Sequence, residues 1–182
     1  MKPEEAHKLL NIAEAAEAEG RLRLSLLGGW SLVLWGGIWT LGYGLAALAP
    51  AWAGLFWVLA APLGILVSFF LGIRQGRWVQ SERGHLTFAL WGLLTLFYLY
   101  WSSLLSPKGL AGQGLLVSLV ALGLALTGRI WQVRGLLSAG LGLFLLDALL
   151  YHLLPQAFPW GMALAGFGAF LYGTQLLWRW TR

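Results

Sequence analysis

The sequence predicts an all-α membrane protein, a bundle of six transmembrane helices preceded by a short amphipathic helix in the cytoplasm. Three observations support this prediction. The 182 residues are 59% hydrophobic and only 10% charged, with a mean hydropathy of +0.73, whereas soluble domains hold about 25% charged residues. Apolar runs close to the ~20 residues needed to cross a bilayer follow one another along the chain. Basic residues gather in alternate breaks between these runs.

Residues 1–23 form the first predicted unit, a cytoplasmic helix that begins at Pro3. Proline followed by two glutamates suits the first turn of a helix, where the positive end of the helix dipole favours acidic side chains. Glu17 and Arg21 are spaced to pair along its surface. This helix carries more Glu than Lys, unlike helices that lie on a membrane. We therefore expect it either to cap the bundle or to dock a cytoplasmic protein through residues 3–20.

Residues 24–182 form the predicted transmembrane domain. The spans are expected at about 25–48, 52–73, 85–105, 113–131, 136–154 and 160–178. The breaks on one side contain Arg21, Arg23, Arg74, Arg77, Arg83, Arg129, Arg134, Arg179 and Arg182, and those on the other contain Pro50, Pro107, Lys108, Pro155 and Pro159. Because basic residues mark the cytoplasmic side of a membrane protein, both termini are predicted to be cytoplasmic.

Several function classes receive no support from the residues. The chain has no cysteine, which excludes disulfides, thiol catalysis and thiolate metal sites. No motif of a metalloprotease, a phosphate-binding loop or a carboxylate pair occurs, so no catalytic residue, metal site or cofactor is predicted. His85 and His152 fall at opposite ends of the predicted bundle and cannot bind one metal ion or haem within this chain. The basic excess is explained by membrane topology, so no nucleic-acid partner is predicted either.

Asp147 is the leading candidate for a functional residue, because no other acidic side chain lies inside an apolar run. An ionised carboxylate near the middle of a bilayer costs roughly 3 kcal/mol, so such residues usually face the bundle interior and find a partner. Tyr151 lies one turn further on the same face, and His152 follows it. Tyr98 in the third span belongs to this candidate site if the third and fifth spans are neighbours. Tyr43, late in the first span, could also belong to it. Asp147 either joins two helices through a polar contact or takes part in the binding or transport of a ligand or ion.

Small residues recur at every fourth position in the second and sixth spans. They are Ala60, Gly64, Ser68 and Gly72 in the second, and Gly161, Ala165, Ala169 and Gly173 in the sixth. Such rows let helix backbones approach closely in a lipid environment. We expect their partners within the same chain, with contact to a second copy in a homo-oligomer as the alternative.

The first eighty residues resemble a group of small bacterial six-span integral membrane proteins with a cytoplasmic N-terminal helix. The resemblance is carried by Trp35, Gly36, Trp39, Gly42, Gly44 and Pro50, and by Gly72, Ile73, Arg74 and Arg77. It implies a multi-pass protein of the bacterial cytoplasmic membrane, and it implies no activity.

Two functions remain open at the level of sequence. The first is a non-enzymatic membrane module that lies in the lipid bilayer and acts through protein partners or oligomerisation. The alternative is a binding or transport protein for a small solute, a lipid or a proton, centred on Asp147.

Overall fold

The computed structural model describes residues 28–76, 82–105 and 109–180, and these are almost entirely helical. The long helices are the first helix (Gly28–Leu48), α2 (Pro50–Gly76), α3 (Glu82–Leu105), α4 (Leu110–Ile130), α5 (Arg134–Leu153) and α6 (Phe158–Trp180), with a short 3-10 turn, η1 (Pro155–Ala157), before α6. No strand occurs in these ranges, so the all-α prediction is confirmed. The predicted cytoplasmic helix lies outside the described residues and stays a prediction.

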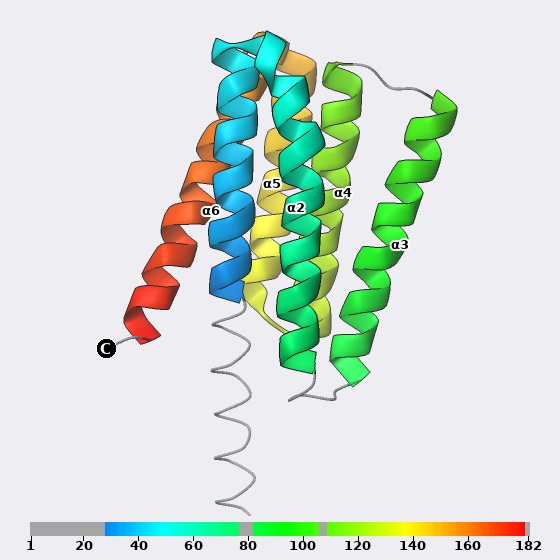
Figure 1. Cartoon of the computed structure of the whole chain (residues 1–182), viewed down its shortest axis with the longest axis vertical. Helices are drawn as coiled ribbons and strands as arrows, with labels where there is room; N and C mark the ends of the chain where they lie inside the picture. The colour runs from blue at the N-terminus through cyan, green and yellow to red at the C-terminus, as the bar shows by residue number, and fades with distance from the viewer. Residues whose placement is uncertain (1–27, 77–81, 106–108, 181–182) are drawn as a thin grey trace, which may run out of the picture.

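The helices run side by side and alternate in direction (Figure 1). Short connections favour packing between neighbours in the chain. The indole N–H of Trp35 on the first helix donates a 2.9 Å hydrogen bond to the hydroxyl of Ser68 on α2. Trp91 on α3 donates one of 3.1 Å to Thr127 on α4. Helix α6 lies beside the first helix, and α3 lies on the opposite side of the bundle (Figure 1).

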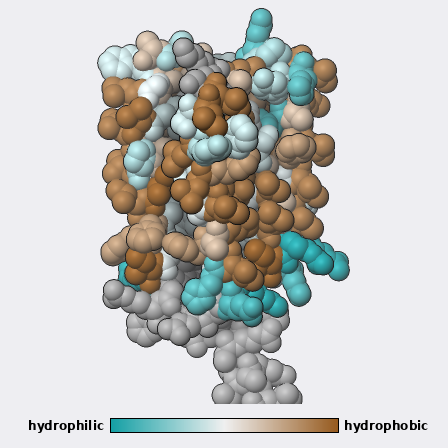
Figure 2. Space-filling model, turned by 90° about the vertical axis from the view of Figure 1, so that its right-hand side faces the viewer, coloured by the Kyte–Doolittle hydropathy of each residue, from teal (hydrophilic) through white to brown (hydrophobic). Residues whose placement is uncertain are grey.

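Five helices, the first helix and α2 to α5, are long and apolar enough to cross a membrane, judged by length and composition. On the face shown in Figure 2, a broad band of hydrophobic side chains covers the middle, with hydrophilic groups toward the ends. No residue of α3 is buried, which is the burial expected of a helix that meets lipid along much of its surface. Helix α6 has 23 residues but is not among these five, and it carries the polar residues Thr174 and Gln175 in its last third. The count of six spans therefore stays a prediction.

The arginines of the described chain all lie at one end of the bundle, which we call the arginine end. Arg74, Arg129 and Arg179 close α2, α4 and α6, and Arg83 and Arg134 open α3 and α5. The opposite, proline end holds Pro50, Pro155 and Pro159. This asymmetry is the pattern from which the topology was predicted. Which side of a membrane the arginine end faces stays a prediction.

Helices α4 and α5 form a tight hairpin at the arginine end. The backbone N–H of Val133 donates to the carbonyl of Gly128 over 2.8 Å, and that of Gln132 donates to Arg129 over 3.3 Å. This pair of bonds is the Schellman arrangement that ends a helix, and Gln132 takes the left-handed conformation it requires, with φ of 56°. Further along the hairpin, a Cβ added to Gly140 would lie 2.5 Å from the backbone nitrogen of Ala125. The two backbones are therefore in contact and fixed in register.

The first helix and α6 are also joined backbone to backbone. A Cβ on Gly36 would lie 2.5 Å from the backbone nitrogen of Phe170, and one on Gly173 would lie 2.8 Å from the carbonyl oxygen of Gly29. Gly166 completes this contact, since a Cβ there would meet the backbone of Thr40 at 2.8 Å. Glycine is needed at these positions because any side chain would separate the helices.

The small residues predicted to lie at helix contacts have different surroundings. Gly64 faces Ile38 and Trp35 of the first helix, and Ser68 accepts the Trp35 hydrogen bond. Gly161 faces Leu150 of α5. Gly72 has no atom within 4 Å of an added Cβ, and Gly173 belongs to the contact with the first helix described above. Ala60, Ala165 and Ala169 are half-buried.

Candidate functional site

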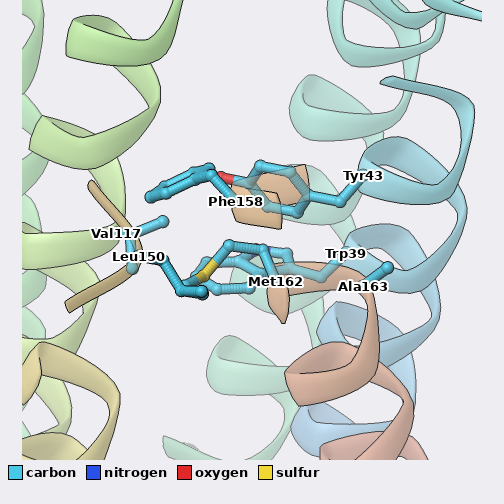
Figure 3. Packing of buried hydrophobic residues seen from close by; sticks show 7 residues of the cluster. All are labelled: Trp39, Tyr43, Val117, Leu150, Phe158, Met162 and Ala163. Carbon is cyan, nitrogen blue, oxygen red and sulfur yellow. The ribbon is translucent and has the colours of Figure 1, made fainter. Parts of the chain in front are cut away.

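The candidate site lies beside the best-packed region of the bundle, near the proline end. Residues of four helices meet there, namely Trp39, Tyr43, Val117, Leu150, Phe158, Met162 and Ala163 (Figure 3). Tyr43 is 1% exposed, and its ring packs edge-on against Trp39, Trp57 and Phe158 with centroids 5.5, 5.3 and 6.2 Å away. Such contacts add to the packing of aromatic rings. This cluster holds α4, α5 and α6 in place around the candidate site.

Asp147 on α5 is the only buried charged or polar residue of the described core, with 4% of its surface exposed. It lies six residues before the end of α5, about 9 Å along the helix from the proline end at the usual rise per residue. The hydroxyl of Ser118 on α4 donates a hydrogen bond of 2.6 Å to Asp147 Oδ2. Asp147 therefore faces another helix rather than lipid, as expected for an acidic residue in an apolar segment.

The second carboxylate oxygen of Asp147 has no such partner. Oδ1 is buried, and no hydrogen-bond donor reaches it from the residues that the structure describes. Almost all buried polar atoms in proteins are paired with protein or water, so an orphaned carboxylate oxygen requires an explanation. The polar oxygens of Gln113 and Ser102 are also buried without a partner in the described chain.

A cleft of about 250 Å³ lies along the seam between α4 and α5 and reaches Asp147. Its walls are Ala111, Gly114, Leu115 and Ser118 of α4, and Phe144, Asp147, Ala148, Tyr151 and His152 of α5. The residues of each helix recur with the i, i+3, i+4, i+7 spacing of one helix face. Gly114 and the two alanines leave the space that larger side chains would fill. The cleft is therefore mostly apolar and contains one carboxylate, that of Asp147.

The other predicted site residues are not all in this cleft. Tyr151 and His152 line it, and their rings pack edge to face with centroids 5.0 Å apart. Tyr98 of α3 is not among the cleft residues. Tyr43 does not line the cleft either, and its ring lies in the hydrophobic cluster described above.

Two residues that the sequence analysis did not single out complete the site. Ser118 supplies the only described hydrogen bond to Asp147, and Gly114 provides room beside it, since an added Cβ would lie 3.8 Å from Asp147 Oδ1. A polar side chain on the inner face of an apolar run was the available signal for Ser118. Gly114 gave no signal of its own, because glycine is common throughout this chain.

Metal binding finds no support in the described part of the chain. No group of three or more His, Cys, Asp or Glu residues is placed to hold a metal ion in these ranges. His85 opens α3 at the arginine end, and His152 closes α5 at the proline end, so the two imidazoles lie far apart. One carboxylate and one exposed imidazole make an incomplete ligand set.

Comparison of the chain with protein-family models, with curated proteins and with solved structures finds no match. The class of protein is therefore defined by the fold and the site alone. It is a helical protein with membrane-span-like helices and, between two of them, a mostly apolar cleft lined by a buried aspartate.

Proposed function

We propose that this protein is a membrane-embedded binding protein that holds a small solute against Asp147 in the cleft between α4 and α5. The observation that supports this function is the unpaired, buried Oδ1 of Asp147 beside a cleft of about 250 Å³. A role confined to fastening helices accounts for Oδ2, which accepts from Ser118, but it leaves Oδ1 unexplained. A bound solute with a hydrogen-bond donor would satisfy that oxygen.

The cleft also has the usual character of a small-molecule site. Such sites are concave, mostly apolar and contain a few polar groups that orient the ligand. Here Ala111, Leu115 and Phe144 supply apolar walls, and Asp147 supplies the acceptor. The volume is slightly below the ~300 Å³ at which ligand sites usually begin. We therefore expect a solute of few non-hydrogen atoms.

The expectation of a partner protein for residues 3–20 remains separate from this proposal. Those residues lie outside the described chain, so the geometry favours neither capping nor docking. The cleft and its carboxylate give the binding function a specific location instead.

A screen of small solutes against the purified full-length chain tests this function. The probes are short amines, alcohols, amides and carboxylic acids, and the readout is the midpoint of thermal unfolding, Tm, in a mild detergent. At least one chemical class should raise the Tm of the wild type but not that of Asp147→Asn or Ala148→Leu. The second variant fills the cleft and keeps the carboxylate. Ala139→Leu is the matched control, because Ala139 is exposed on α5 and does not line the cleft.

The screen has an outcome that would overturn the proposal. If no probe separates the wild type from both cleft variants, the carboxylate serves only to join α4 to α5. Helical content measured by circular dichroism identifies a variant that fails to fold.

A further inference from the structure

We infer that the solute held at Asp147 carries a primary ammonium group on a short apolar body. This inference rests on the proposed binding function and narrows it to one chemical class. It follows from three features of the site: the kind of partner that Oδ1 lacks, the distribution of positive charge along the bundle, and the composition of the cleft walls.

The first feature is the missing donor. An ionised carboxylate only accepts hydrogen bonds, and its two oxygens have several acceptor positions. Ser118 has one O–H, and it is already directed at Asp147 Oδ2 over 2.6 Å. Oδ1, buried beside the cleft, requires an N–H or O–H from another molecule. A quaternary ammonium has a positive charge but no N–H, so it cannot donate a hydrogen bond to Oδ1.

The second feature is the distribution of charge. Removing a carboxylate from water without a positive partner is costly, and hydrogen bonding alone seldom compensates. In the described chain every arginine lies at the arginine end, and the nearest on α5, Arg134, is 13 residues from Asp147. That spacing is about 20 Å along the helix. Among the described residues, the only basic group at the cleft is the imidazole of the exposed His152, so we expect the ligand to supply the positive charge beside Asp147.

The third feature is the wall of the cleft. Four of its nine residues are alanine, leucine or phenylalanine, and this apolar part of the wall favours an alkyl chain. Tyr151 and His152 stand at the edge with their rings 5.0 Å apart, and aromatic faces attract cations. The ammonium is therefore placed at Oδ1, with its alkyl body between Leu115 and Phe144.

A primary ammonium can come from two sources. One is a free alkylamine, and the other is the ethanolamine headgroup of a phospholipid. Asp147 lies about 9 Å from the proline end of α5, a depth that a headgroup amine reaches only if the lipid bends into the cleft. The experiment includes both sources.

The experiment uses the full chain in nanodiscs made only of phosphatidylcholine, which offers no primary amine. Binding of n-hexylamine is measured by equilibrium dialysis and compared with that of hexan-1-ol and hexyltrimethylammonium. The variants are Asp147→Asn, Ala148→Leu and the control Ala139→Leu.

We expect n-hexylamine to bind most tightly, with an affinity at least 10-fold lower in Asp147→Asn, the factor that follows from losing a charged hydrogen bond. A second set of nanodiscs contains phosphatidylethanolamine, and weaker n-hexylamine binding in this set identifies the headgroup as a competitor.

The variant Lys108→Gln is included because Lys108 is the one lysine that the sequence places between spans at this end. Equal binding of n-hexylamine by this variant and the wild type supports the inference. If Lys108→Gln binds n-hexylamine and the wild type does not, the inference is overturned. The ammonium beside Asp147 in the wild type would then belong to Lys108. Preference for hexan-1-ol would also overturn it and leave the binding function intact. No binding of any probe to the wild type would count against both.

Discussion

Gly140 on α5 lies so close to Ala125 on α4 that a Cβ on Gly140 would be 2.5 Å from the Ala125 nitrogen and 2.6 Å from the Ala121 carbonyl oxygen. Backbone atoms cannot rotate away as side chains can. This contact and the Schellman turn at Gln132 fix the register of the hairpin, and that register brings Ser118 opposite Asp147.

Gly140→Ala should therefore destabilise the bundle by about 1–3 kcal/mol, the usual cost of forcing extra atoms into a packed site. The measurement is the free energy of unfolding in mixed micelles, followed by loss of helical circular dichroism. Gly142→Ala is the matched control, because nothing lies within 4 Å of a Cβ there. That control should be neutral, or stabilised by up to about 1 kcal/mol, since alanine is the better helix former. Equal losses in both variants would contradict the contact.

Ser118→Ala removes the hydrogen bond to Asp147 Oδ2 and leaves both carboxylate oxygens unpaired. We expect a loss of about 0.5–2 kcal/mol in the free energy of unfolding, the range measured for hydrogen bonds between membrane helices. Ser138→Ala on the same hairpin is the control. The Ser138 side chain is exposed and bonds only to the Gly135 carbonyl of its own helix in the described structure, so its loss should change stability by less than about 0.5 kcal/mol.

Gly114→Ala tests the shape of the cleft. The new methyl would lie 3.1 Å from Tyr151 Cδ2 and 3.8 Å from Asp147 Oδ1, so it narrows the space where an ammonium would sit. We expect n-hexylamine affinity to fall several-fold while helical content stays unchanged. Gly142→Ala should bind as the wild type does. Unaltered affinity in Gly114→Ala would place the ligand elsewhere along the seam.

The absence of cysteine allows a direct test of orientation. Gln156→Cys places a thiol in the exposed turn η1 at the proline end, and Val133→Cys places one in the exposed α4–α5 turn at the arginine end. In intact cells, a membrane-impermeant maleimide should label Gln156→Cys only, because the arginine end is expected to be cytoplasmic. Both should react after the cells are opened. Labelling of Val133→Cys in sealed cells would reverse the orientation.

Sequence reasoning was effective for the helices because their signals are local. Long apolar runs and their arginine-containing breaks are consecutive in the chain, and the helices α2 to α6 follow them closely. Asp147 was also identifiable, since a single acid in an apolar run is conspicuous. Its burial and its contact with α4 follow from the cost of exposing a carboxylate to lipid.

The partners of these residues were harder to predict because they depend on how helices rotate against each other. A row of small residues indicates a contact face but not which members touch. Gly166 lies against the backbone of Thr40, whereas Gly72, with the expected spacing in α2, meets nothing within 4 Å. Ser118 and Gly114 likewise became site residues only through the register of the α4–α5 hairpin.

The close approach of Gly36 to α6 has a consequence for biosynthesis. Helix α6 is not among the five described helices that are long and apolar enough to cross a membrane, and its backbone fits against the first helix. We expect the entry of α6 into the lipid to depend on the first helix being present already, so that the contact between these two helices forms late. In a Gly36→Leu protein, protease added to detergent-free vesicles should cut a tag fused after Arg182 in vesicles of both orientations. In the wild type, the protease should cut this tag in vesicles of one orientation only.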